Sequence, residues 1–311
     1  MKVLFVASGN KSVGKVSAFV QSQFDSLKQE GLDMFLFPVV GHGVSGYLKN
    51  LLSLRRLIKK ECPDVVHAHY SSCGYLASLA ALGLETKVVV SILGSFPRKS
   101  NKLRFVRFCI DHVWDATIVK SERTRSQLDR DLPVIPNGVN LDRFTIIDQD
   151  KAREMVGFEK EKKYVIFVSD PARPEKQFGL AKEAVNQLND SSVQLVPVYN
   201  KTHDEVVYYM CAANVLLMTS SCEGSPNVIK EAMACNCPIV VTDVGDVQWV
   251  MDGMEGTAVS DSFNPNEIAG LLRKTLDFGE RTQGREKIIN LGLTSSLVAQ
   301  SIIRVYCSNV S

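Results

Sequence analysis

The feature that most constrains the fold of this 311-residue chain is a repeated alternation of short apolar runs with helical patterns. In the first half of the chain, the apolar runs predict strands at 2–7, 34–39, 64–69, 87–93, 116–120 and 133–135. In the second half, they predict strands near 163–169, 193–198, 214–219, 238–242 and 257–259. Helical patterns, such as 14–29 and 47–61, separate the runs. Because strands that alternate with helices form parallel sheets, this order predicts an α/β protein with two parallel-sheet domains.

A domain boundary is expected at VIPNGVNLDRF (134–144), where a proline is followed by an Asn-Gly turn and then by a polar run. The chain is also long for a single hydrophobic core. We predict three segments, namely an N-terminal domain at 1–143, a C-terminal domain at 144–294 and a last helix at 295–311 that could pack back across the first domain. Two such sheets imply a ligand in a cleft between the carboxyl ends of their strands, so the loops there are expected to carry the chemistry.

The composition excludes several classes of protein. Hydrophobic residues make up 45% of the chain and charged residues 23%, which is usual for a soluble globular protein. No apolar run approaches the roughly 18–20 residues that a membrane span needs, and the N-terminal MKVLFVASGN resembles a first strand more than a secretory signal. The eight cysteines lie mostly in apolar contexts without metal-ligand spacing, so we expect free thiols, a cytoplasmic protein and no bound metal.

Positive charge is concentrated in the first half of the chain. Residues 1–143 carry 20 Lys and Arg against 12 Asp and Glu, a net charge of +8, whereas the remainder carries −6. Much of the excess lies in YLKNLLSLRRLIKK (47–60) and RKSNKLRFVR (98–107). The asymmetry is either a drift in surface composition or the mark of a first domain that faces an anionic acceptor or the inner face of a membrane.

The segment ASGNKSVGKVS (7–17) is similar to a phosphate-binding P-loop, which would make the chain an ATPase or GTPase. That loop needs a hydroxyl directly after its lysine to bind Mg²⁺, and here Val16 follows Lys15. The P-loop interpretation is therefore rejected. A glycine-containing turn between strand and helix remains, in which backbone N–H groups could face a phosphate.

The segment TSSCEGSPNVIKEAMACNCPIVVTD (219–243) predicts a strand, a turn, a helix and another strand. Ser225 is the expected N-cap of the helix and Pro226 its first residue, which leaves the N–H groups of Asn227 and Val228 free to bind an anion. Glu231 follows about 7–8 Å further along the helix axis, a separation similar to that between the phosphates and the ribose hydroxyls of a nucleotide. An ordinary solvated glutamate is the alternative for this position.

Three charged side chains are expected near this helix N-terminus. Glu223 lies in the turn before the helix, where it is either a capping carboxylate or a contact to a sugar beyond the phosphates. Arg173 and Lys176 follow the first strand of the second domain and should lie at the same edge of the sheet. The alternative for Arg173 is an ordinary surface residue without a role in binding. Two cations and a helix N-terminus can neutralise a diphosphate leaving group without metal.

Several segments resemble the retaining glycosyltransferases of family 4. The motif Glu223-x7-Glu231 is similar to the signature of that family, and PDVVHAHY (63–70), IPNGVNLDRF (135–144) and RPEKQF (173–178) also resemble its segments. The resemblance covers nearly the whole chain. It implies the GT-B fold, in which two Rossmann-like domains face each other across a cleft. It also implies transfer of a sugar from a nucleoside diphosphate sugar, with retained anomeric configuration.

On this resemblance Glu223, Lys176 and Arg173 are the catalytic candidates, and the two cations hold the diphosphate. Glu231 holds the ribose. The remaining donor-binding candidates are Gly14 and Lys15 in the first domain, the strand end at Pro197, Val198 and Tyr199, and the turn residues Gly224, Ser225, Pro226, Asn227 and Val228. The chain departs from the family after the fourth strand, where Leu93-Gly94-Ser95-Phe96 stands in place of His-Gly-x-Asp. His69 and Gly94 are the acceptor-side candidates.

The resemblance implies a class of substrate but no cofactor. The donor is expected to be a UDP-sugar, and the acceptor a glycan, a lipid-linked glycan or a small molecule, with surface polysaccharide synthesis as the setting. No nucleic acid partner is expected. Asp129-Arg130-Asp131 and Asp148-Gln149-Asp150 imitate a metal-binding D-x-D motif but lie in polar connecting segments. The alternatives are an isomerase similar to UDP-sugar 2-epimerases and a nucleotide-sugar-binding protein without catalysis.

Overall fold

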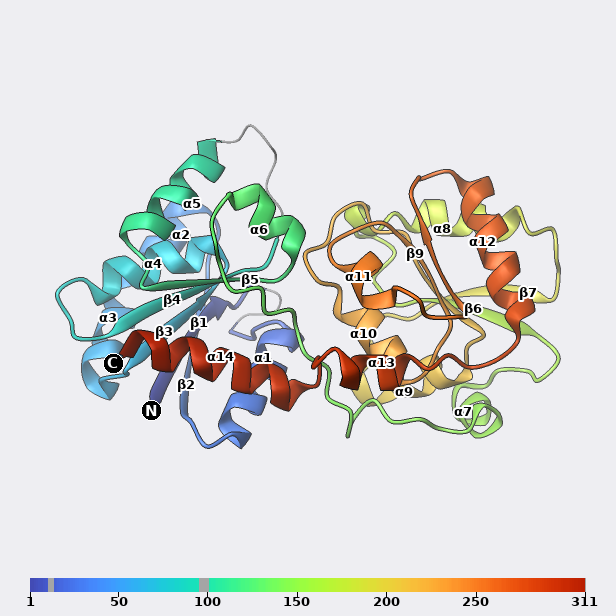
Figure 1. Cartoon of the computed structure of the whole chain (residues 1–311), viewed down its shortest axis with the longest axis horizontal. Coiled ribbons are helices and arrows are strands. Elements are labelled where there is room, and N and C mark those ends of the chain that lie inside the picture. Colours follow the sequence, from blue (N-terminus) through green and yellow to red (C-terminus); the bar gives the residue numbers. More distant parts are fainter. Residues whose placement is uncertain (11–13, 95–100, 311) are drawn as a thin grey trace. The chain divides into compact units, whose positions relative to one another are not determined.

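The computed structural model describes residues 1–10, 14–94 and 101–310 of the chain (Figure 1). Residue contacts divide it into two units, Met1–Gly138 with Ser295–Ser311, and Val139–Thr294. The division falls five residues before the boundary expected at 143. The side chains of Val139 and Phe144 belong to the core of the second unit, and the Val139 N–H donates to Leu293 O at 2.9 Å.

The first unit contains a parallel five-stranded sheet. Its strand order is β2 (Asp33–Val39), β1 (Lys2–Ser8), β3 (Val65–His69), β4 (Lys87–Ile92) and β5 (Ala116–Val119). All five residues of β3 are buried, as expected for a central strand that is covered on both faces. The predicted strand at 133–135 is absent, because only an isolated bridge joins Val134 to Val119.

Helices cover both faces of this sheet. One face packs against α1 (Ala18–Gln29) and α14 (Ser295–Val310). The other face packs against α2 (Gly43–Leu48), α3 (Leu51–Glu61), α4 (Ser71–Ala81), α5 (Asn101–His112) and α6 (Glu122–Leu128) (Figure 1). The predicted helix at 47–61 is two helices, since the Asn50 side chain donates to Gly46 O at 2.8 Å and to Val40 O at 2.9 Å. In α14, Val298, Ala299 and Ile302 enter the core, and Tyr306 Oη hydrogen-bonds to His67 Nδ1 at 2.5 Å.

The second unit repeats this architecture. Its parallel sheet has the order β10 (Thr257–Ser260), β9 (Ile239–Thr242), β8 (Val215–Met218), β6 (Lys163–Phe167) and β7 (Val193–Pro197). One face packs against α7 (Gln149–Val156), α9 (His203–Ala212), α10 (Asn227–Ala234), α11 (Val247–Met251) and α13 (Gly284–Asn290). The other packs against α8 (Phe178–Asn186) and α12 (Pro265–Phe278). All five strands predicted for this half are present, and the α/β prediction of two parallel sheets is confirmed.

Candidate functional site

The turn between β8 and α10 carries the expected donor-binding residues of the second unit. The helix begins at Asn227, and Pro226 is its N-cap, with no side-chain hydrogen bond to the first turn. The N–H groups of Asn227 and Val228 therefore lie at the helix N-terminus, where they have no partner further back in the helix. The prediction of Ser225 as the cap is wrong, because its hydroxyl donates to Asp246 Oδ2 at 2.8 Å instead.

Glu231 lies one turn into α10 and is partly exposed. The surrounding protein partly desolvates its carboxyl group, which raises the pKa of Glu231 to about 7, against the opposing positive charges of Arg143 and Lys230. No described residue donates a hydrogen bond to this carboxylate. A partly exposed carboxylate without a protein donor is open to hydrogen bonds from the hydroxyl groups of a ligand.

Lys176 and Glu223 meet in the second unit, although 47 residues separate them in the sequence. Lys176 ends the 3₁₀ helix Pro174–Lys176 that follows β6, and its Nζ donates to Glu223 Oε1. The side chains are 14% and 21% exposed, so the ion pair is partly screened from solvent but within reach of a ligand. Two of the three catalytic candidates therefore form one charged pair beside the N-terminus of α10.

Hydrogen bonds to backbone carbonyl groups connect the loop after β6 to the turn after β8. The Thr219 hydroxyl donates to the carbonyl oxygens of Lys176 and Gln177, both at 3.0 Å, and the Ser221 N–H donates to Glu175 O at 2.9 Å. Gln177 has φ +50°, which turns the chain sharply into α8. These contacts position the lysine against the glutamate.

Arg173 is not part of this pair. Its side chain is half exposed, and its Nε donates to Glu175 Oε1 at 2.8 Å. A hydrogen bond from the Glu175 backbone and then the Arg173 guanidinium lower the pKa of the Glu175 carboxyl. Arg173 thus lies in the expected loop, but its charge is engaged by a neighbouring carboxylate.

Of the two donor-binding candidates that follow β7, one is exposed and the other is buried. Tyr199 is 46% exposed, whereas the Val198 side chain is buried in the core and its N–H donates to Phe167 O at 2.8 Å. Val198 is therefore a core residue, while the exposed Tyr199 ring could stack on a base.

The candidates of the first unit lie at the carboxyl edge of its own sheet. Gly14 has φ +80°, and Lys15 beside it is exposed, while residues 11–13 of the same turn are outside the described residues. Gly94 is exposed directly after β4, and Ser95 and Phe96 also lie outside the described part.

His69 has a different environment. It is fully buried, it stacks on His67 with ring centroids 4.6 Å apart, and neither ring nitrogen has a hydrogen-bond partner among the described residues. Burial, assisted by the charge of Lys120, lowers the pKa of His69 to about 3. His69 is therefore a neutral residue of the core and has no surface exposed to an acceptor.

The sequence prediction missed Lys230 and Asp246. Both are buried, and Lys230 Nζ donates to Asp246 Oδ2 at 2.9 Å. The signals were a lysine directly before Glu231, in a helix whose other side chains are apolar except for Asn227, and an aspartate in the glycine turn after β9. Considered alone, Lys230 and Asp246 are each predicted to be solvated charges.

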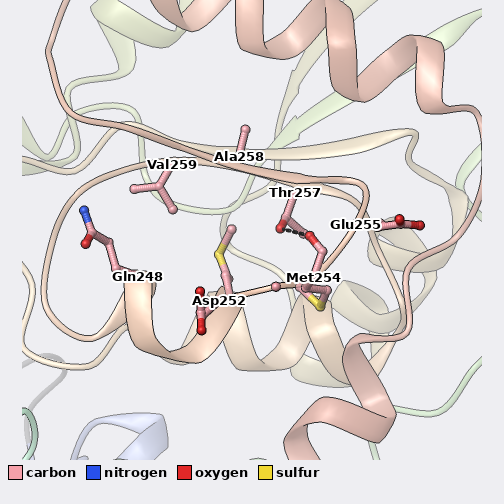
Figure 2. A pocket seen from close by; sticks show the side chains of 9 residues that line it. Gln248, Asp252, Met254, Glu255, Thr257, Ala258 and Val259 are labelled. Atoms are coloured by element: carbon pink, nitrogen blue, oxygen red, sulfur yellow. Dashed lines mark hydrogen bonds between the residues drawn. The ribbon is translucent and has the colours of Figure 1, made fainter.

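A groove of about 510 Å³ lies elsewhere in the second unit, between α11 and the edge strand β10 (Figure 2). Gln248, Asp252 and Val259 line it, and Thr257 Oγ1 donates to Met254 O at 2.7 Å at its wall. None of the predicted donor-binding residues lines this groove. A much smaller cavity, of about 10 Å³, lies behind Lys176 and Val228 and is too small for more than a single water molecule.

Within the described ranges, no group of three or more His, Cys, Asp or Glu side chains could hold a metal ion. No helix in the same part of the chain has the length and apolar character that crossing a membrane requires.

Two parallel α/β units, with a glutamate-bearing turn at a helix N-terminus in the second, are the architecture of a GT-B glycosyltransferase. The model of Glycosyltransferase Family 4 matches residues 16–143, and the model of Glycosyl transferases group 1 matches residues 159–277. Together the two matches cover most of the chain. The chain belongs to glycosyltransferase family 4.

Curated relatives agree with this assignment, and a solved structure agrees with the fold. The glycosyltransferase TuaC of Bacillus subtilis, whose name assigns it provisionally to teichuronic acid biosynthesis, is 27% identical over 214 residues, which are 60% of this chain and 54% of TuaC. The match thus spans about half the length of that relative. The UDP-Gal:alpha-D-GlcNAc-diphosphoundecaprenol alpha-1,3-galactosyltransferase of Escherichia coli is 25% identical over 276 residues, 74% of this chain and 71% of the relative. The structure of Anabaena Alr3699/HepE in complex with UDP and glucose has a TM-score of 0.75 at 15% identity and covers 99% of this chain and 100% of its own, which supports the fold.

Proposed function

We propose that this chain is a retaining glycosyltransferase that transfers a sugar from a nucleoside diphosphate sugar, with UDP as the nucleotide. The observation that carries the proposal is the Lys176–Glu223 pair beside the N-terminus of α10, with the Glu231 carboxylate one turn further along the same helix. A cation, free N–H groups and a carboxylate in this order match the leaving phosphates and the ribose of such a donor. The UDP named in the Anabaena complex and the UDP-galactose named for the Escherichia coli relative support the choice of nucleotide.

Each group has a definite task in this proposal. The Lys176 ammonium and the N–H groups of Asn227 and Val228 neutralise the charge that develops on the leaving diphosphate. The Glu231 carboxylate accepts hydrogen bonds from the ribose hydroxyls. Glu223 faces the donor sugar, where its charge stabilises the positive character of the reacting carbon. The acceptor is a glycan, a lipid-linked glycan or a small molecule, and surface polysaccharide synthesis is the setting that the names of both relatives favour.

A screen of nucleotide sugars against thermal unfolding tests the function. The correct donor at about a hundredfold excess over its Kd should stabilise the protein by about 2.7 kcal/mol and raise Tm by roughly 5–10 °C. Donors with other bases should give smaller shifts. Product analysis with a mixture of candidate acceptors then separates transfer from the alternatives. Release of an epimerised sugar would favour the isomerase, and binding with no chemical change would favour a protein that only binds nucleotide sugars.

Transfer should not require a divalent metal. Lys176 and the helix N-terminus already supply positive charge to the leaving group, and this predicts equal initial rates in EDTA and in added Mg²⁺ or Mn²⁺, within about twofold. The measurement is nucleoside diphosphate release by enzyme that has first been dialysed against chelator. A rate that vanishes in EDTA and returns only with one of these ions would contradict the prediction.

We also propose that the first unit contacts an anionic membrane surface through the outer face of α5. Phe105 and Phe108 are 53% and 52% exposed, their rings stack with centroids 6.4 Å apart, and the exposed Lys102 and Arg104 precede them in the same helix. Exposed aromatic rings together with cations on one helix are suited to the interface of an anionic bilayer. Arg107 is not part of this face, because it donates to Leu128 O at 2.9 Å and Gln127 O at 3.0 Å. Arg98 and Lys99 of the predicted basic segment lie outside the described residues.

The membrane contact predicts a defined loss of vesicle binding. The double variant Lys102→Gln/Arg104→Gln should bind vesicles rich in phosphatidylglycerol roughly 10- to 30-fold more weakly at low salt, since each cation near such a surface contributes about 1 kcal/mol. Phosphatidylcholine vesicles should bind neither form. The matched control is Lys160→Gln/Lys201→Gln, which removes two exposed cations from the second unit. Equal binding of all three proteins would show that the outer face of α5 is ordinary solvated surface with no role in membrane contact.

A further inference from the structure

A buried charged cluster lies behind the turn that carries Glu223. Lys230 and Asp246 have side chains that are 1% and 5% exposed, and Lys230 Nζ donates to Asp246 Oδ2 at 2.9 Å. Lys230 also donates to Ser225 Oγ, and the Ser225 hydroxyl donates to Asp246 Oδ2 at 2.8 Å. The three side chains come from the turn before α10, from α10 itself and from the loop before α11.

A buried ion pair is by itself weak evidence of a contribution to stability. Removing two charges from water costs several kcal/mol, and replacement of a buried ion pair by apolar side chains of similar volume is often neutral or stabilising. What the ion pair adds is direction, because its hydrogen bonds fix the turn, the helix and the loop at defined angles to one another. An apolar cluster of the same volume would hold them together without fixing the angles.

The loop of Asp246 also packs tightly against the turn. Gly245 has φ +60°, and a Cβ at this position would lie 2.6 Å from Gly224 O and 3.3 Å from Glu223 O. Three residues before Gly245, the Thr242 hydroxyl donates to Ser220 O at 2.7 Å. The turn is therefore held on one side by the loop of Lys176 and on the other by residues 242–246.

We propose that Lys230, Asp246 and Ser225 are positioning residues that hold the N-terminus of α10 and the Glu223–Gly224 turn in the geometry that a diphosphate requires. The proposal rests on the proposed donor binding. Lys230 is fully buried and acts only through Ser225 and Asp246. Preorganised N–H groups bind an anion better than groups that must first be ordered, so loss of the cluster should affect the phosphate contacts more than the contacts to the nucleoside.

The double variant Lys230→Met/Asp246→Leu tests this with UDP and uridine as probes. It replaces the ion pair by apolar side chains, so its Tm should lie close to that of the wild-type protein. Its affinity for UDP relative to uridine should fall at least tenfold, which is the effect of losing a hydrogen bond to a charged group. Asp246→Asn keeps the shape and the acceptor oxygen but weakens both contacts, and an intermediate loss of about threefold to tenfold is expected. The matched control is Lys160→Met/Asp150→Leu, which removes an exposed pair with an N–O distance of 2.8 Å.

The outcomes separate this inference from the function on which it rests. A wild-type protein that binds no nucleoside diphosphate overturns the proposed function and this inference together. A wild-type protein that binds UDP, with an unchanged UDP-to-uridine ratio in the folded double variant, overturns the positioning role alone. If the double variant does not fold, an unchanged ratio in Asp246→Asn has the same consequence. A lower ratio in both variants, with the control unchanged, supports the role.

Discussion

Replacing Glu231 by Ala should weaken the binding of UDP and of the UDP-sugar donor by the same factor, roughly 10- to 150-fold. The carboxylate would accept hydrogen bonds from the ribose, and a hydrogen bond to a charged group contributes about 1.5–3 kcal/mol. Because the ribose is common to donor and product, the contact is made equally to both ligands, and the rate at saturating donor should change little. Titration calorimetry with UDP and steady-state kinetics measure the two quantities. Wild-type affinity for UDP in this variant would remove the ribose assignment.

The same carboxyl group should make the stability of the free protein depend on pH. The pKa of Glu231 is about 7 in the folded chain against an ordinary 4.5, so the unfolded chain releases this proton at lower pH than the folded one. The stabilising effect of the proton is fully present below pH 4.5 and is lost as the pH rises to about 7. Glu231→Gln should therefore be more stable than the wild-type protein at pH 8, by up to about 3 kcal/mol, and nearly equal to it at pH 4.5.

Glu205 provides a control of opposite sign for this measurement. A hydrogen bond from the Thr202 backbone, and then those from Lys201 and Thr202 side chains, lower the pKa of the Glu205 carboxyl. Its stabilising effect is present at neutral pH and is lost as the pH falls through that lowered pKa. Glu205→Gln should therefore destabilise the protein at pH 7 and 8 and approach the wild-type protein in acid. Urea denaturation of both variants at several pH values gives the comparison. Parallel pH profiles for wild-type protein and Glu231→Gln would show that the Glu231 carboxyl is well solvated.

The sequence predicts the elements of this fold because their signals are local. Strand β8, helix α10 and strand β9 follow from an apolar run, a turn with proline and a second apolar run within residues 215–242. Asn50 shows the limit of such patterns. Its side chain donates to Gly46 O and Val40 O at the break between α2 and α3, and the apolar periodicity on both sides does not reveal this break.

The sequence predicts which site residues lie together only where those residues belong to one short segment. Glu223 and Glu231 lie together in one turn and helix, whereas Lys176 comes to Glu223 from another strand end through the Thr219 and Ser221 contacts to the loop of Lys176. Those contacts depend on how two loops pack, and no periodicity encodes that. The same holds for Lys230 and Asp246, where burial turns two apparently solvated charges into a pair. His69 is the reverse case, since a histidine at a strand end is exposed or buried according to the helices that cover it.

The second large effect concerns the Lys176–Glu223 pair. Replacing the lysine and replacing the glutamate should change UDP affinity in different ways. In the free unit the lysine is engaged by the glutamate, so a diphosphate must compete with a carboxylate for the ammonium group. Lys176→Met removes the cation, and UDP affinity should fall roughly 10- to 150-fold, together with turnover. Glu223→Gln releases the cation, and UDP should bind as tightly as before or up to about fivefold more tightly, since a partly exposed ion pair contributes about 1 kcal/mol.

Turnover should respond in the opposite way to affinity in Glu223→Gln. If the carboxylate faces the donor sugar, its charge matters most when the reacting carbon becomes positive, and the rate at saturating donor should fall about 10²- to 10³-fold while UDP binding is spared. Calorimetry with UDP and single-turnover transfer at saturating donor separate the two effects, and Lys176→Met/Glu223→Gln completes the cycle. A Glu223→Gln variant that loses UDP affinity as strongly as Lys176→Met would show that the glutamate serves to hold the lysine. The sugar contact would then belong to another residue, because a carboxylate that only orients Lys176 acts on the diphosphate in the ground state and the transition state alike.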